Sequence, residues 1–115
     1  MTEADIQRDI VDYLRLVAPE HLTFAVPNAA RRTDRGYASN AVPGLLKGIA
    51  DLCTISPGGR AYLLEVKSAG GHLRSEQAAM QLRCSQSGIP YAVVRSIDDV
   101  REALKLWGVK TREAA

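Results

Sequence analysis

The chain has 115 residues and a formal net charge of +2, and 46% of its residues are apolar while 24% are charged. A chain of this length is predicted to fold as one domain, residues 1–115, and to bury about two-thirds of the surface that its unfolded form exposes. The composition is typical of a soluble globular protein. The small positive charge permits a nucleic-acid partner without requiring one, and no apolar run approaches the ~20 residues that span a membrane.

The two cysteines, Cys53 and Cys84, lie far apart and match neither a CxxC pattern nor a Cys/His ligand spacing. We therefore expect two reduced thiols, with a disulfide as the less favoured alternative. No signal peptide is visible at the N-terminus. Together these features favour an intracellular, cytoplasmic protein.

The first periodic segment has apolar residues at helical spacing, from Ile6 to Val17. It predicts a helix that Thr2 caps and that Pro19 ends. A short strand is predicted over residues 22–26. No clean period follows between residues 28 and 48, and an irregular stretch of that length in a small domain is often functional.

The second half of the chain predicts five elements: a strand, its hairpin partner, a helix, a third strand and a last helix, over residues 49–55, 60–68, 75–88, 90–96 and 96–108. Ser75 and Ser96 are the predicted N-caps of the two helices, and Gly88 and Gly108 are their stops. The predicted fold class is α/β, with the element order α-β-β-β-α-β-α.

The predicted hairpin brings charged residues together at one end. Side chains of a strand alternate between its faces, so Glu65 and Lys67 share one face while Leu64 and Val66 share the other. A three-residue loop centred on Gly58 would place Asp51 directly opposite Glu65, whereas a two- or four-residue loop would shift the pairing by one position. Asp51 and Glu65 are therefore expected to be close neighbours.

Two carboxylates that face each other across a ladder are destabilising unless something neutralises them. Lys67 would do part of this, and a divalent cation such as Mg²⁺ or Mn²⁺, which prefers oxygen ligands, would do more. Such a metal would polarise a phosphoryl oxygen and lower the pKa of a bound water, and Lys67 would orient that water or offset charge in the transition state. This is phosphodiester hydrolysis. The alternative is a surface Glu-x-Lys ion pair of small energetic value, and the residue chemistry alone leaves both interpretations open.

With these residues identified, the chain resembles the PD-(D/E)xK nuclease superfamily and, within it, the virus-type replication-repair nuclease (VRR-NUC) family. Five blocks carry the resemblance, in chain order: "TEADIQRDIVDYLR", "VPNAARR", "LLKGIADL", "LLEVK" and "GHLRSEQAAMQ". Ala50 stands where the superfamily name has proline, a position that supplies no ligand.

The resemblance implies a metal-dependent nuclease whose mixed sheet is flanked by helices. It implies a catalytic set and a metal-ligand set; the former comprises Asp51, Glu65, Lys67 and Gln77, and the latter comprises Asp51, Glu65, the Val66 carbonyl and, through water, Glu3. Gln77 would help to hold substrate or water at the edge of the site. Small standalone members of the family are associated with phages and bacteria, form homodimers and act on branched DNA such as Holliday junctions.

Basic residues beside such a site suit contacts to the DNA backbone, which position a duplex without reading its sequence. Four residues before the Asp51 strand are the DNA-binding candidates: Asn28, Arg31, Arg32 and Lys47. His21 is expected on the surface, far from the site. A homodimer would present an apolar interface, for which the sequence offers Leu45, Leu46 and Trp107 as candidates.

Three functions fit these observations. The favoured one is a Mg²⁺- or Mn²⁺-dependent endonuclease that selects branched DNA by its shape. The alternatives are an exonuclease or restriction-type endonuclease of the same superfamily, and a non-catalytic DNA-binding module. The Asp51, Glu65 and Lys67 set argues against the last, and the short chain leaves little room for elements that read base edges.

Overall fold

The computed structural model describes residues 1–27, 32–33, 36–37 and 43–113, with only the backbone given at 32–33 and 36–37. Its elements run in the order α1 (Glu3–Val17), β1 (Leu22–Ala25), β2 (Arg32–Thr33), β3 (Gly36–Tyr37), β4 (Leu52–Ile55), β5 (Ala61–Val66), α2 (Ser75–Gln86), β6 (Tyr91–Val94) and α3 (Ile97–Leu106). The predicted α/β class with a mixed sheet flanked by helices is confirmed.

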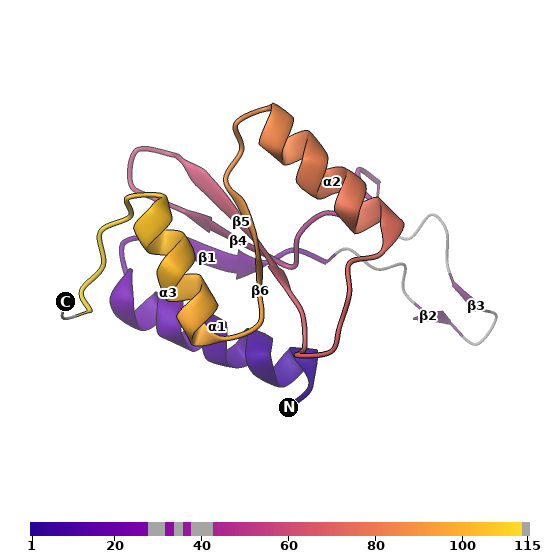
Figure 1. Ribbon diagram of the computed structural model, residues 1–115, viewed down its shortest axis with the longest axis horizontal. Coiled ribbons are helices and arrows are strands. Elements are labelled where there is room, and N and C mark those ends of the chain that lie inside the picture. Colours follow the sequence, from indigo (N-terminus) through magenta and orange to yellow (C-terminus); the bar gives the residue numbers. More distant parts are fainter. Residues whose placement is uncertain (28–31, 34–35, 38–42, 114–115) are drawn as a thin grey trace.

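Four strands form the main sheet in the order β1-β4-β5-β6. The pairs β1/β4 and β4/β5 are antiparallel, and β5/β6 is parallel because α2 crosses over between them. Figure 1 shows α1 and α3 on one side of this sheet and α2 on the other. No helix among the described residues has the length and apolarity to cross a membrane.

The β4–β5 hairpin has the predicted register. Leu52 pairs with Leu64, and Ile55 pairs with Ala61. The Ser56 N–H donates to the Arg60 carbonyl at 2.9 Å, which leaves a three-residue loop centred on Gly58, whose φ is +98°. A left-handed φ of this kind is readily adopted only by glycine, so Gly58 permits the three-residue loop, which is one of the loop lengths that the sequence left open.

The helix caps are confirmed at two of three positions. Thr2 and Asp5 exchange reciprocal hydrogen bonds at 3.1 Å in a capping box, and Ser96 Oγ accepts the Asp99 N–H at 3.1 Å. Ser75 was wrong as the cap of α2, because the cap is Arg74 and Ser75 is already helical. The Arg74 N–H is satisfied instead by the Gln77 side chain, at 2.9 Å.

The predicted element order lacked one feature. A small two-stranded sheet, β2–β3, lies where the sequence predicted an irregular segment, with Arg32 opposite Tyr37 and Thr33 opposite Gly36. Two-residue strands are too short to show an alternating hydrophobic pattern, so backbone pairing alone reveals them.

The hydrophobic core lies between the sheet and the α1/α3 layer. The sheet contributes Leu52, Leu64 and Val66, each 0% exposed, and the helices contribute fully buried residues such as Ile10 and Val100. This apolar face fixes the register of β4 and β5, because a slip by one residue would turn their apolar side chains away from the core.

Candidate active site

The ends of β4 and β5 bring two carboxylates together. Asp51 immediately precedes β4, and the hairpin register continued by one residue places it opposite Glu65, as predicted. Asp51 Oδ2 accepts the backbone N–H of Val66 at 2.9 Å, and the Asp51 carbonyl accepts the Val26 N–H at 2.8 Å. These bonds tie Asp51 to both neighbouring strands and therefore fix its position against Glu65.

Glu65 and Lys67 are charged residues that the fold removes from water. The Glu65 side chain is 1% exposed and that of Lys67 is 5% exposed, and Lys67 Nζ lies 3.6 Å from Glu65 Oε2. Ion pairs as deeply buried as this carry a large desolvation penalty and add little net stability. Their presence on a strand whose other face is apolar therefore points to a functional site.

Gln77 of α2 holds the Glu65 carboxylate from the opposite side. Its Nε2 donates to Glu65 Oε2 at 3.1 Å, and its Oε1 accepts the Arg74 N–H at 2.9 Å. The side chain is buried, and both ends of its amide already contact protein groups. The sequence predicted a residue at the edge of the site that holds substrate or water, whereas the structure places Gln77 where it orients Glu65.

The Glu65 carboxyl has an unusual electrostatic environment. Burial, reinforced by the nearby Asp51 carboxylate, raises the pKa of Glu65 to about 8, and Lys67 opposes this shift only in part. Glu65 Oε1 is buried and has no hydrogen-bond partner among the described residues. A buried oxygen without a partner, beside a second carboxylate, fits a hard divalent cation, which would supply the missing positive charge.

Among the described residues, no third His, Cys, Asp or Glu side chain joins Asp51 and Glu65 to complete a metal-ligand set. Within the described ranges, no three His, Cys, Asp or Glu residues gather into a metal-holding group. The exposed Glu3 lies at the same end of the sheet: a methyl group placed on Gly71, in the turn after Lys67, would lie 3.4 Å from Glu3 Oε2. Figure 1 likewise shows the start of α1 beside the segment that follows β5. Glu3 as a water-mediated ligand and the Val66 carbonyl as a direct one stay predictions.

Gly48 has a structural role near the site that the sequence pattern did not indicate. Gly48 has a φ of +84°, and a Cβ atom there would lie 2.5 Å from the Glu76 carbonyl oxygen in the first turn of α2. Only glycine permits this contact, which holds the segment before Asp51 against the helix that carries Gln77. The only hint of this close contact in the sequence was a glycine three residues before Asp51.

The DNA-binding candidates are only partly placed by the structure. Lys47 is exposed beside Gly48, near the first turn of α2, as a phosphate contact requires. Asn28 and Arg31 lie outside the described residues, and Arg32 is described by its backbone alone, in β2.

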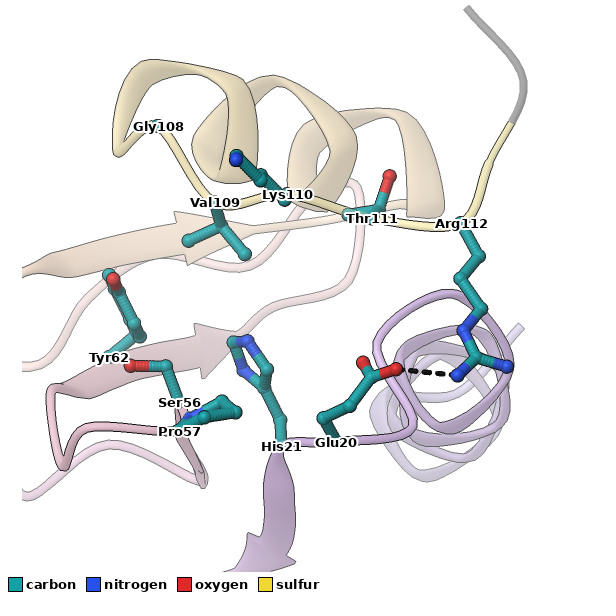
Figure 2. A pocket seen from close by; sticks show the side chains of 10 residues that line it. All are labelled: Glu20, His21, Ser56, Pro57, Tyr62, Gly108, Val109, Lys110, Thr111 and Arg112. Carbon is teal, nitrogen blue, oxygen red and sulfur yellow. Dashed lines mark hydrogen bonds and ion pairs between the residues drawn. The ribbon is translucent and has the colours of Figure 1, made fainter.

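A cavity of about 490 Å³ lies at the other end of the hairpin, away from the carboxylates. Figure 2 shows His21 and Val109 pointing into it, with the Glu20–Arg112 ion pair at its rim. His21 is half-buried rather than a surface residue, because its Nδ1 lies 3.1 Å from Thr54 Oγ1 and its ring stacks on Tyr62. Its distance from the carboxylates agrees with the sequence prediction.

Comparison with known proteins gives a consistent result. The sequence profile of the VRR-NUC domain family matches residues 5–98. A solved structure described as a VRR_NUC domain is similar, with a TM-score of 0.63 and 20% sequence identity over 91% of this chain and 97% of that chain. At this identity the structural likeness shows the fold alone. No curated protein sequence matches the chain.

Proposed function

The chain belongs to the VRR-NUC family of nuclease domains, and from that membership and the charges buried around Glu65 we propose that it is a Mg²⁺- or Mn²⁺-dependent endonuclease that hydrolyses DNA phosphodiester bonds. The observation that carries the proposal is the pairing of Asp51 with Glu65 at the sheet end, with Lys67 Nζ 3.6 Å from Glu65 Oε2. No apolar core needs such a group, whereas a phosphodiester-cleaving site does.

Asp51 and Glu65 would hold the metal, with the Val66 carbonyl as a third protein ligand and Glu3 acting through water. When bound, the metal would polarise a phosphoryl oxygen and favour deprotonation of the attacking water. The partnerless Glu65 Oε1 supports this assignment, because a cation would satisfy it. The raised pKa of Glu65 supports it too, because a divalent charge would favour the ionised carboxylate.

The chain's other residues have separate roles in this proposal. Lys67, buried beside Glu65, orients the attacking water and offsets the negative charge that grows on the phosphorus oxygens in the transition state. Gln77 keeps the Glu65 carboxylate in one orientation. Asn28, Arg31, Arg32 and Lys47 bind phosphates of the DNA backbone, which positions the strand without reading bases.

We further propose that the substrate is branched DNA and that the working unit is a homodimer. A 115-residue chain carries one site, whereas a four-way junction has two strands to cut. Two chains related by a two-fold axis would match the symmetry of that substrate. Of the interface candidates, Leu46 is 45% exposed, whereas Trp107 packs on Tyr62 and is half-buried, so Leu46 suits an interface best.

The decisive experiment incubates the protein with a matched set of labelled substrates: a four-way junction, a flap, a nicked duplex, a linear duplex and a single strand. We expect internal incisions, strongest on a branched substrate, in Mg²⁺ or Mn²⁺ and none in EDTA. Glu65→Gln protein prepared identically controls for contaminating nucleases. Degradation from the strand ends without internal incision would indicate an exonuclease. Binding of DNA without cleavage in either metal would indicate a DNA-binding module. Light scattering of the free and junction-bound protein tests the dimer.

A further inference from the structure

Arg95, which directly follows β6, reaches across to the segment that leaves β5. Its Nη1 donates to the Ser68 carbonyl at 2.6 Å and to the Gly71 carbonyl at 2.7 Å. The Gly71 N–H also donates to the Ser68 carbonyl, at 3.0 Å, which closes a turn over residues 68–71. One guanidinium therefore holds both ends of this turn.

Arg95 is itself held by the fold. Its backbone N–H donates to Asp99 Oδ2 at 2.8 Å, and the Asp99 N–H donates to the Ser96 cap at 3.1 Å. The start of α3 thus anchors the residue whose side chain closes the turn. Arg95 is half-buried, and hydrogen bonds from a guanidinium donor to carbonyl oxygens are stronger than those from a neutral donor.

The turn at residues 68–71 begins directly after Lys67. The Lys67 N–H donates to the Val94 carbonyl at 3.0 Å, which is the last backbone bond between the two strands before the chain leaves the sheet. Beyond that bond, the Arg95 contacts hold the segment that directly follows Lys67. The same turn borders Glu3 through Gly71.

We propose that Arg95 is a positioning residue of the nuclease site: by closing the 68–71 turn it fixes Lys67 in its place against Glu65. This inference rests on the proposed function. It differs from the more obvious role for an arginine near a DNA-cleaving site, which is a direct contact to a backbone phosphate. The two roles predict different effects of replacing Arg95. Loss of a phosphate contact would weaken DNA binding, whereas loss of a positioning contact would lower the rate of the chemical step.

The test compares wild type with Arg95→Gln, Arg95→Lys and Arg60→Gln. Arg60 lies over the Tyr62 ring at the other end of the hairpin, so its replacement makes the same charge change away from the turn. We would measure the single-turnover cleavage rate at saturating DNA, the salt dependence of DNA binding, and hydrogen exchange of the Gly71 amide. Arg95→Lys keeps a charged donor and provides a second variant should Arg95→Gln fail to fold.

We expect Arg95→Gln to lower the single-turnover rate about 10- to 100-fold, because small misplacements of reacting groups have effects of this size. The Gly71 amide should exchange faster while core amides of α1 and α3 keep their protection. Arg95→Lys should recover part of the rate, and Arg60→Gln should behave like wild type in all three measurements.

Three results would overturn the inference. An unchanged rate together with a salt slope reduced by about one unit would make Arg95 a phosphate contact. An unchanged rate despite faster Gly71 exchange would show that the turn does not position Lys67, and a general loss of protection in every element would make the role merely structural. Wild-type protein that cuts no DNA would overturn the nuclease proposal instead, and the Gly71 exchange would still decide whether Arg95 holds the turn.

Discussion

At the C-terminal end of strand β5, the residues on its two faces are both buried and are chemically opposite. Leu64 and Val66 are each 0% exposed and pack into the core beneath α1 and α3. The side chains of Glu65 and Lys67 are 1% and 5% exposed on the face beneath α2, where they contact each other and where Glu65 also meets Asp51 and Gln77. The end of this strand thus separates an apolar layer from a charged one by the alternation of its side chains alone.

This contrast shows that side chains in one small domain are buried for two different reasons, stability and function. Removing an apolar side chain from water stabilises the fold by about 1.5–3 kcal/mol, so Leu64 and Val66 are explained by stability. Removing a charge from water opposes folding, even when the charge is paired. The burial of Glu65 and Lys67 is therefore not explained by stability. The charged layer persists because the fold around it is already held by the apolar layer. Predictions that separate activity from stability test this division.

The largest expected effect is the loss of cleavage on neutralising either carboxylate. Asp51→Asn and Glu65→Gln should abolish measurable cleavage, since each removes an oxygen charge that the metal requires. Near pH 8 and above, where Glu65 is ionised, neither variant should melt below wild type, because each also relieves repulsion between the two acids. Cleavage assays and thermal melts measure the two outcomes, with the exposed Glu102→Gln as the matched control. Substantial residual cleavage by either variant would contradict the assignment.

Lys67→Ala should lower the cleavage rate by orders of magnitude with a much smaller change in DNA affinity. The reason is that Lys67 is buried against Glu65 and acts on charge in the transition state, where the surroundings screen it little. Single-turnover rates at saturating DNA and equilibrium binding are the measurements. A strong loss of affinity with an unchanged rate would show instead that Lys67 only contacts a phosphate.

The apolar face should respond in the opposite way. Leu64→Ala should lower the free energy of unfolding by about 2–5 kcal/mol, because it leaves a cavity in the core. Below its lowered melting temperature the variant should still cleave at close to the wild-type rate. Denaturant unfolding and cleavage at low temperature test this, and Leu82→Ala, at a position that is 59% exposed, should leave the free energy of unfolding nearly unchanged. A stable but inactive Leu64→Ala protein would break the division between the two faces.

Much of this arrangement was predictable because it depends on local pattern. The glycine-rich loop centred on Gly58 sets the register, and the register alone brings Asp51 opposite Glu65. The alternation of Leu64, Glu65, Val66 and Lys67 assigns the faces. The caps Thr2 and Ser96 follow from side-chain chemistry within three residues of the helix start.

The rest depends on contacts between distant segments, which no local pattern encodes. Gln77 reaches Glu65 across 12 positions, Arg95 reaches Ser68 across 27, and Gly48 fits against Glu76 through the absence of a side chain. The misassigned cap of α2 has the same origin, since the Gln77 side chain satisfies the Arg74 N–H and Ser75 is not needed. Sequence thus predicted that Asp51 and Glu65 lie opposite each other, but not the contacts that orient them.

A smaller effect should appear in the pH dependence of stability. The pKa of Glu65 is raised from its ordinary 4.5 to about 8 by burial, so between these pH values folded protein retains a proton that unfolded protein has lost. Metal-free wild type should therefore lose stability as pH rises from about 5 to 8. Glu65→Gln lacks this loss, and its melting temperature in EDTA should exceed that of wild type by a margin that grows across this range. Parallel curves for the two proteins would contradict the raised pKa.

The smallest effect is expected at Glu113, a glutamate with the opposite shift. Arg101 Nε donates to the two carboxylate oxygens of Glu113 at 3.0 and 2.9 Å, and the Tyr13 hydroxyl donates to the same carboxylate. These hydrogen bonds, those from Arg101 most, lower the pKa of Glu113 to about 2. They also tie the C-terminal segment to α3 and α1. A lowered pKa adds stability above pH 4.5 that is lost as pH falls towards 2. Because these groups are accessible to solvent, the contribution is small.

Glu113→Gln should lower the melting temperature slightly at pH 7, and the difference from wild type should vanish near pH 2, with Glu102→Gln as the control. Cleavage should not change, because this ion pair lies on the α1/α3 side of the sheet, whereas the carboxylate pair faces α2. A Glu113→Gln protein that is stable but impaired in cleavage would show that the two faces are coupled.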